Sequence, residues 1–253
     1  MKLVIQIPAY NEEQDIVSVL TKISKTYSKI DDVKIILIDD GSTDNTCKYA
    51  EPYVDKIIKH EKRLGLAKTF FSGVSWALKE GADIIINLDG DGQYKPEEIP
   101  LILDPLITGS ADVSIGSRPI TNMPWFSSKK KFLQIFGTFF LNRVVGSTIK
   151  DYPCGFRAMS RKVASQLVFY TTYTYTIEMN ILGTYLNFKF DNIDITVNEP
   201  TRPSRLIKSN TQYILRAMES TWVSMIRYKK GRLFFQVGSV IGIFLVCVKL
   251  GLS

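Results

Sequence analysis

The chain has 253 residues, of which 45% are hydrophobic and 23% charged, and its formal net charge is +7. This length suits one large α/β domain or two modest ones, and the composition excludes a generally disordered chain. The basic residues are clustered, but no surface of interleaved aromatic and basic residues is evident, so nucleic acid is not an expected partner. Three cysteines without paired spacing exclude a disulfide framework and favour a reducing compartment.

The first part of the chain alternates between strand and helix patterns. Short runs of Ile, Val and Leu predict strands at residues 3–7, 34–38, 56–59, 84–88 and 113–115. Helical periodicity predicts helices at residues 12–27, 43–53 and 67–79. Continuous apolar strands between helices are typical of a mostly parallel sheet with helices on both faces. In such sheets a ligand binds outside the carboxyl ends of the strands.

Polar and charged residues follow four of these strands, at the edge where a ligand is expected. In the most informative stretch, Asp89 and Asp91 stand one residue apart directly after an apolar run. Two carboxylates this close repel each other unless a cation lies between them, and oxygen ligands of this kind suit Mg²⁺ or Mn²⁺. A solvated turn rich in Asp and Gly would explain the same residues, so the spacing alone leaves both interpretations open.

The C-terminal part has the features of a membrane-associated protein. Residues 129–145 begin with a basic cluster and have a broad apolar, aromatic face, which suits a helix in a membrane interface or, alternatively, a core helix. Residues 209–228 are a second candidate interfacial helix. Residues 233–248 are almost wholly apolar but shorter than the ~20 residues of a typical membrane helix. This apolar segment predicts a membrane anchor, and a buried soluble helix is the alternative. More basic residues precede the segment than follow it, which predicts that the main domain lies on the cytoplasmic side.

These patterns predict three parts: an α/β domain at residues 1–210, an amphipathic juxtamembrane helix at 211–232 and a transmembrane anchor at 233–250. A short single anchor matches a bilayer poorly, which could favour association of neighbouring copies. The sequence leaves a homo-oligomer open.

Five motifs make residues 1–210 resemble the inverting family 2 glycosyltransferases, which have the GT-A (Rossmann-like) fold. The motifs are Pro-Ala-Tyr-Asn-Glu at residues 8–12, Asp-Asp-Gly-Ser-Thr-Asp at 39–44, Asp-Gly-Asp-Gly-Gln at 89–93, Gly-Ser-Arg at 116–118 and Cys-Gly-Phe-Arg at 154–157. Within this family the chain is most similar to the polyprenyl-phosphate glycosyltransferases, such as dolichyl-phosphate mannosyltransferase. The resemblance implies metal-dependent transfer of one sugar from GDP-mannose or a UDP-sugar to a polyprenyl or dolichyl phosphate lipid, with inversion.

The resemblance also implies roles for individual residues. The nucleotide would contact Pro8, Tyr10, Glu12, Asp39, Asp40, Asp89 and Arg202. Asp89, Asp91 and Gln93 would hold the Mg²⁺ or Mn²⁺ ion on the diphosphate. The acceptor phosphate would bind Arg118, Lys130 and Lys131, and Asp91 and Arg118 would act in catalysis.

The sequence differs from the motifs of some members of this family at two points, and each difference excludes one kind of reaction or catalytic group. Gly155 stands where some relatives have an acidic residue, so no catalytic base is identified at this position. The Gln-x-x-Arg-Trp motif of processive synthases is absent from the sequence, which argues against a polymerising enzyme. Two alternatives remain: a glycosyltransferase with a non-lipid acceptor, and a non-catalytic membrane protein that binds nucleotide sugars.

Overall fold

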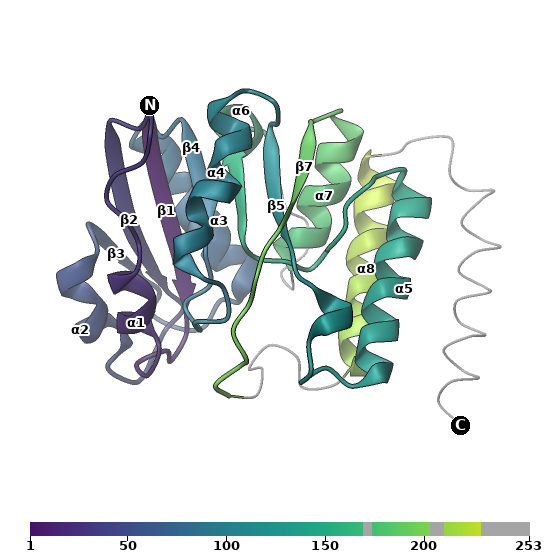
Figure 1. Cartoon of the computed structure of the whole chain (residues 1–253), viewed down its shortest axis with the longest axis horizontal. Coiled ribbons are helices and arrows are strands. Elements are labelled where there is room, and N and C mark those ends of the chain that lie inside the picture. The colour runs from purple at the N-terminus through teal and green to yellow at the C-terminus, as the bar shows by residue number, and fades with distance from the viewer. Residues whose placement is uncertain (169–173, 203–209, 229–253) are drawn as a thin grey trace.

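The computed structural model describes residues 1–168, 174–202 and 210–228 of the chain (Figure 1). Its centre is a seven-stranded sheet with the order β3-β2-β1-β4-β6-β5-β7. Neighbouring strands are parallel except where β6 pairs with β4 and β5. The predicted mostly parallel sheet is therefore confirmed.

Five strands occupy the predicted positions. They are β1 (Lys2–Ala9), β2 (Asp32–Asp39), β3 (Lys56–Lys59), β4 (Ile84–Asn87) and β5 (Val113–Ser117). The residues of β4 and nearly all of those of β1 are buried, which explains their unbroken apolar runs. Because these strands are parallel, their carboxyl ends meet at one edge of the sheet, and the polar loops that follow them lie close together.

Helices lie on both faces of this sheet, with α3 (Leu66–Lys79) behind it and α4 (Ile99–Ile107) in front of it in Figure 1. The prediction of α3 is confirmed, but α1 (Ile16–Thr21) and α2 (Thr46–Ala50) are shorter than predicted. The Ser24 hydroxyl bonds to the backbone of Thr26, and such local bonds compete with helical ones after α1. Single 3₁₀ turns occupy Glu51–Tyr53, Pro96–Glu98 and Ile120–Asn122.

Several elements have no counterpart in the sequence prediction. They are α4, β6 (Arg157–Ser160), α6 (Arg161–Ala164), α7 (Tyr175–Tyr185) and β7 (Phe190–Asp194). The two strands are short and mix charged with apolar residues, so neither gives an apolar run. Helix α4 contains Pro105, which ordinarily argues against a helix. Helix α7 is buried along most of its length and therefore has no polar face to produce helical periodicity.

The two predicted interfacial helices are present as α5 (Ser128–Val145) and α8 (Asn210–Tyr228), close to the predicted bounds. Helix α5 begins after Ser127, whose hydroxyl caps it, and ends at Gly146 in the left-handed region. It is not a core helix, because Val145 is its one fully buried residue. Phe132, Ile135 and Phe139 are instead 64%, 47% and 66% exposed, which agrees with the interfacial interpretation.

In the part of the chain with described structure, no helix is both long and apolar enough to cross a membrane. The predicted anchor at residues 233–248 lies outside the described residues, so it stays a prediction.

Candidate active site

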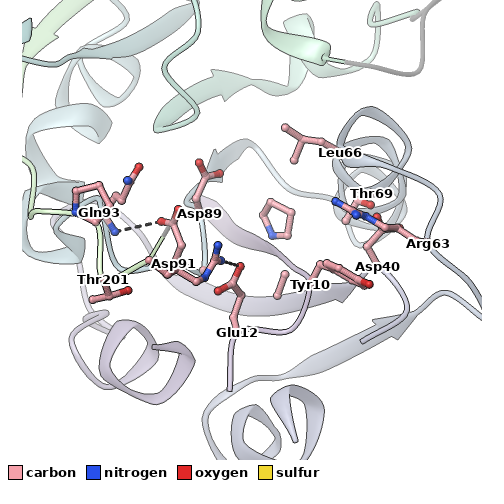
Figure 2. A pocket seen from close by; sticks show the side chains of 15 residues that line it. Tyr10, Glu12, Asp40, Arg63, Leu66, Thr69, Asp89, Asp91, Gln93 and Thr201 are labelled. Carbon is pink, nitrogen blue, oxygen red and sulfur yellow. Dashed lines mark hydrogen bonds and ion pairs between the residues drawn. The ribbon is translucent and has the colours of Figure 1, made fainter. Parts of the chain in front are cut away.

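A pocket opens at the carboxyl ends of β1, β2 and β4, where the sequence predicts the site (Figure 2). The hollow measures about 830 Å³, a volume that includes space open to solvent. Eight of the nine residues predicted for the nucleotide and the metal line it: Pro8, Tyr10, Glu12, Asp40, Asp89, Asp91, Gln93 and Arg202. The fold thus gathers these distant parts of the sequence into one cavity.

Asp89 and Asp91 form the acidic side of the pocket, directly after β4 (Figure 2). The buried amide of Asn87 donates to Asp89 Oδ1 at 3.3 Å and to the carbonyl oxygen of Gly155 at 3.0 Å. A Cβ atom at position 155 would lie only 2.7 Å from Asp89 Oδ2. Glycine at this position therefore lets the Asp89 carboxylate pack against the loop that carries the Cys-Gly-Phe-Arg motif.

The two carboxylates carry a charge that the surrounding protein does not fully compensate. Burial, and then the neighbouring charge of Asp91, raise the pKa of Asp89 to about 7. Burial likewise raises the pKa of Asp91. Arg118 and Arg157 act in the opposite direction on Asp89 but do not outweigh its burial. A buried acidic pair of this kind gains stability when a cation binds between its members.

The residues present fit a divalent cation. The backbone N–H of Gln93 donates to Asp91 Oδ1 at 3.1 Å, which fixes the turn, and the Gln93 side chain lines the same pocket. No cluster of three or more His, Cys, Asp or Glu suited to a metal occurs among the described residues. Mg²⁺ and Mn²⁺ commonly bind one or two carboxylates together with substrate phosphates. An ion held by Asp89, Asp91 and Gln93 would therefore have coordination positions open to phosphate oxygens or water.

The opposite side of the pocket is formed by Tyr10, Asp40 and Arg63 (Figure 2). The Arg63 guanidinium lies over the Tyr10 ring, 4.3 Å from its centroid. Asp40 accepts two backbone N–H groups just before α3, at 2.8 and 2.9 Å, and contacts a ring nitrogen of His60 at 3.0 Å. Asp40 therefore fixes the loop that carries Arg63, and His60 has a structural role in this network.

Residues 197–202 form a strap along one wall of the pocket. Asn198 bonds to the carbonyl groups of Gln93 and Gly92, both at 2.9 Å, through its backbone and side-chain amides. Farther along, Arg202 forms an ion pair with Glu12. The strap therefore joins the loop of the acidic pair to the loop after β1. The following residues, 203–209, lie outside the described part of the chain.

Asp39 is the one predicted nucleotide residue that does not line the pocket. It is fully buried, and its two carboxylate oxygens accept the backbone N–H of Ser42 at 3.1 and 3.3 Å. Asp39 thus holds the turn after β2, and its contact with the nucleotide stays a prediction.

The predicted acceptor residues lie outside the pocket lining. Arg118 follows β5 and binds Asp151 with two nitrogens, Nε at 2.6 Å and Nη2 at 2.9 Å. Burial opposes the charged guanidinium, but Asp151 outweighs it, so the pKa of Arg118 is raised well above its usual value. Burial, and then the charge of Arg118, lower the pKa of Lys130, whose ammonium lies over the Phe126 ring, 3.7 Å from its centroid. Lys131 instead donates to the carbonyl oxygen of Thr121 at 2.8 Å.

Sequence reasoning missed five pocket residues, namely Arg63, Leu66, Thr69, Pro200 and Thr201. The first three flank Gly65, whose φ of +93° is readily adopted only by glycine. A glycine just before a helical apolar pattern was therefore an available signal for this part of the site. Thr201 gave no comparable signal, because only the folded strap brings it to the pocket.

The fold and this site define a GT-A glycosyltransferase, and comparison with solved structures supports the fold. Glucosyl-3-phosphoglycerate synthase from Mycobacterium tuberculosis, solved with Mn²⁺, UDP-glucose and phosphoglyceric acid, superposes with a TM-score of 0.68. It is 19% identical, and the match covers 90% of this chain and 79% of that one.

Residues 4–168 match the sequence profile of Glycosyl transferase family 2, and the chain belongs to this family. It is therefore a transferase enzyme. Polyprenol monophosphomannose synthase of Mycolicibacterium smegmatis is 25% identical, over 84% of this chain and 82% of that protein. UDP-N-acetylglucosamine–dolichyl-phosphate N-acetylglucosaminyltransferase of Methanococcus voltae is 32% identical, over 64% of this chain and 70% of that protein. Relatives of this chain thus act on polyprenyl phosphates.

Proposed function

We propose that this enzyme transfers one sugar from a nucleotide sugar, GDP-mannose or a UDP-sugar, to a polyprenyl or dolichyl phosphate. The transfer would be metal-dependent and inverting, and would take place at the cytoplasmic face of a membrane. The observation that carries the proposal is the buried pair Asp89 and Asp91, which lines the open pocket at the carboxyl ends of β1, β2 and β4. The names of the relatives support the lipid acceptor.

The two sides of the pocket suit the two parts of the donor. Tyr10 and Arg63 offer a flat, cationic surface to the nucleoside. Asp89, Asp91 and Gln93 would hold the Mg²⁺ or Mn²⁺ ion, which stabilises the charge that develops on the departing diphosphate. Arg202 lines the same cavity and can add a second positive charge.

The acceptor supplies its own nucleophile. The second pKa of a phosphate monoester is near 6, so such an acceptor is largely ionised at neutral pH. The protein therefore has to position the acceptor phosphate, and it does not have to remove a proton from it. Arg118, after β5, and Lys130, in the first turn of α5, would bind this phosphate, and the charge of Arg118 lowers the pKa of Lys130 after the larger effect of burial. Gly155 provides no acidic group, which agrees with a reaction that needs no protein base.

Helix α5 supports a lipid acceptor. Its exposed residues Phe132, Ile135 and Phe139 lie three or four positions apart, which places them on one stripe of the helix. Lys130 precedes this stripe by half a turn, so this predicted acceptor cation and the apolar stripe are on the same helix. An aromatic face next to basic residues is typical of a helix in a membrane interface. The apolar residues 233–248 and the basic residues before them support an anchor with the catalytic domain in the cytoplasm.

The test is a transfer assay with the full-length protein in detergent. GDP-mannose, UDP-glucose and UDP-N-acetylglucosamine are each paired with undecaprenyl phosphate, dolichyl phosphate or 3-phosphoglycerate, with Mn²⁺ or with EDTA. We expect one mass-identified glycosyl lipid, formed only with Mn²⁺ or Mg²⁺. Transfer to 3-phosphoglycerate alone would show the soluble-acceptor alternative to be correct.

Two variants make this assay specific for the acidic pair. Asp91→Asn should abolish transfer, because it removes one of the two carboxylates that would bind the metal. Asp104→Asn is the matched control, since Asp104 is exposed on α4. Full activity of the Asp91 variant, or of the wild type in EDTA, would refute the metal assignment.

A further inference from the structure

Asp151 is a buried carboxylate for which neither the sequence motifs nor the pocket lining gives a role. It is 1% exposed, and it follows the turn after α5. Besides the two bonds from the Arg118 guanidinium, it accepts the Arg118 backbone N–H at 3.3 Å. It also accepts the side-chain amide of Gln134, on α5, at 3.1 Å. A carboxylate with this many donors holds each of them in a fixed place.

The pairing of Arg118 with Asp151 sets the direction of the guanidinium. A bidentate bond between an arginine and a carboxylate is planar, so it fixes the guanidinium plane as well as its position. Nε and Nη2 of Arg118 donate to Asp151, whereas Nη1 of Arg118 makes no hydrogen bond to the residues that the structure describes. The Arg118 side chain keeps 13% of its surface exposed. Arg118 can therefore bind a phosphate oxygen through Nη1 without breaking its pair with Asp151.

Gln134 connects this pair to the helix that carries the apolar stripe. Lys130 and Gln134 are four residues apart on α5, so they lie on the same face of the helix. The exposed Phe132 and Phe139 lie on a different face. One face of α5 thus contacts the pair formed by Arg118 and Asp151, while another offers apolar side chains to its surroundings.

From these contacts we propose that Asp151 is a positioning residue that presents Arg118 to the acceptor phosphate, and that Gln134 ties this pair to α5. The inference rests on the proposed function, because it assumes a phosphate-bearing acceptor. It adds two residues to the acceptor site that lie outside the five family motifs. It also predicts that acceptor binding depends on the position of α5 relative to Arg118 and Asp151.

The kinetic test uses the full-length protein and separates the two substrates. Asp151→Asn keeps the shape of the side chain but weakens its bond to Arg118, so the KM for the polyprenyl phosphate should rise about tenfold to a hundredfold. The KM for the nucleotide sugar should not change. Gln134→Ala should raise the acceptor KM by a smaller factor, about twofold to tenfold, because it removes one neutral donor. Asp194→Asn is the matched control, since Asp194 is an exposed partner of Lys150.

A purely structural role gives a different result. It would lower kcat or change both KM values together, and either outcome in both variants would overturn the inference. Arg118→Lys combined with Asp151→Asn should cost no more than the worse single variant, because both changes disable the same group. Additive losses would also contradict the proposal. If Asp151→Asn fails to fold because the buried Arg118 loses its counter-charge, the Gln134→Ala result decides.

A binding experiment separates this inference from the proposed function. Citronellyl phosphate, a short and water-soluble polyprenyl phosphate, is titrated calorimetrically into wild type and variants. Binding that Asp151→Asn weakens at least tenfold would support the inference even if no sugar transfer is seen. Equal binding by both proteins, or no binding by the wild type, would overturn it.

Discussion

The contact between Gly155 and Asp89 leads to a sharp prediction for Gly155→Ala. The new Cβ atom would lie 2.7 Å from Asp89 Oδ2 and 2.9 Å from Oδ1, whereas ordinary contacts of this kind begin near 3.4 Å. The backbone at 155 has little room to retreat. Its N–H donates to the Tyr94 hydroxyl at 3.0 Å, and its carbonyl oxygen accepts the Tyr175 hydroxyl at 3.2 Å. The Asp89 carboxylate therefore has to move into the pocket.

The size of this movement sets the expected effect. Restoring an ordinary contact needs a shift of about 0.7 Å, and a misplacement of about 1 Å at a reacting centre can cost roughly a hundredfold in rate. We expect kcat to fall about tenfold to a hundredfold and the affinity for Mn²⁺ to fall with it. Overpacking of a buried site costs about 1–3 kcal/mol, so the protein should still fold, with a Tm lower by roughly 2–10 °C.

The assay is a calorimetric titration of Mn²⁺ in the presence of a nucleoside diphosphate, combined with steady-state transfer rates. Gly137→Ala is the control, because a Cβ atom there meets nothing within 4 Å. If Gly155→Ala keeps the Mn²⁺ affinity and the transfer rate of the wild type, the Asp89 carboxylate does not bind the cation from its position against Gly155.

Three further predictions follow from the site and from α5. Because burial, and then Asp91, raise the pKa of Asp89 from 3.8 to about 7, its stabilising contribution in the metal-free protein is lost as the pH rises through this window. Mn²⁺ needs the ionised pair, so it should raise the Tm more at pH 8 than at pH 5.5, and an equal shift at both would contradict this. Arg63→Ala should raise the donor KM about twofold to fivefold, with kcat unchanged, because one cation–π contact is lost. Replacing Phe132 and Phe139 with Ser should weaken binding to anionic lipid vesicles in a flotation assay, whereas the exposed Phe71→Ser on α3 should not.

The sequence predicted most of the residues that line the pocket, because each of the motifs that carry them is local. Asp89 and Asp91 directly follow a buried strand, and the parallel sheet brings all such strand ends to one edge. The order of the strands in the sheet was therefore not needed to predict that these residues lie close together. The strands β6 and β7 could not be predicted in the same way, because their stability comes from pairing with β4 and β5 and not from their own composition.

The acceptor side could be predicted only in part, since its geometry depends on distant pairs. Arg118 was predicted to bind the acceptor phosphate, and the structure adds that it binds Asp151, which is 33 residues further along the chain. No local pattern marks that partner, and Lys131, which was grouped with Lys130, contacts a backbone carbonyl instead. A cation held by a buried carboxylate differs from a free one, because its direction is fixed before the ligand arrives and less ordering is needed on binding. The charge at this side of the site was therefore predictable from sequence, whereas its preorganisation follows only from the fold.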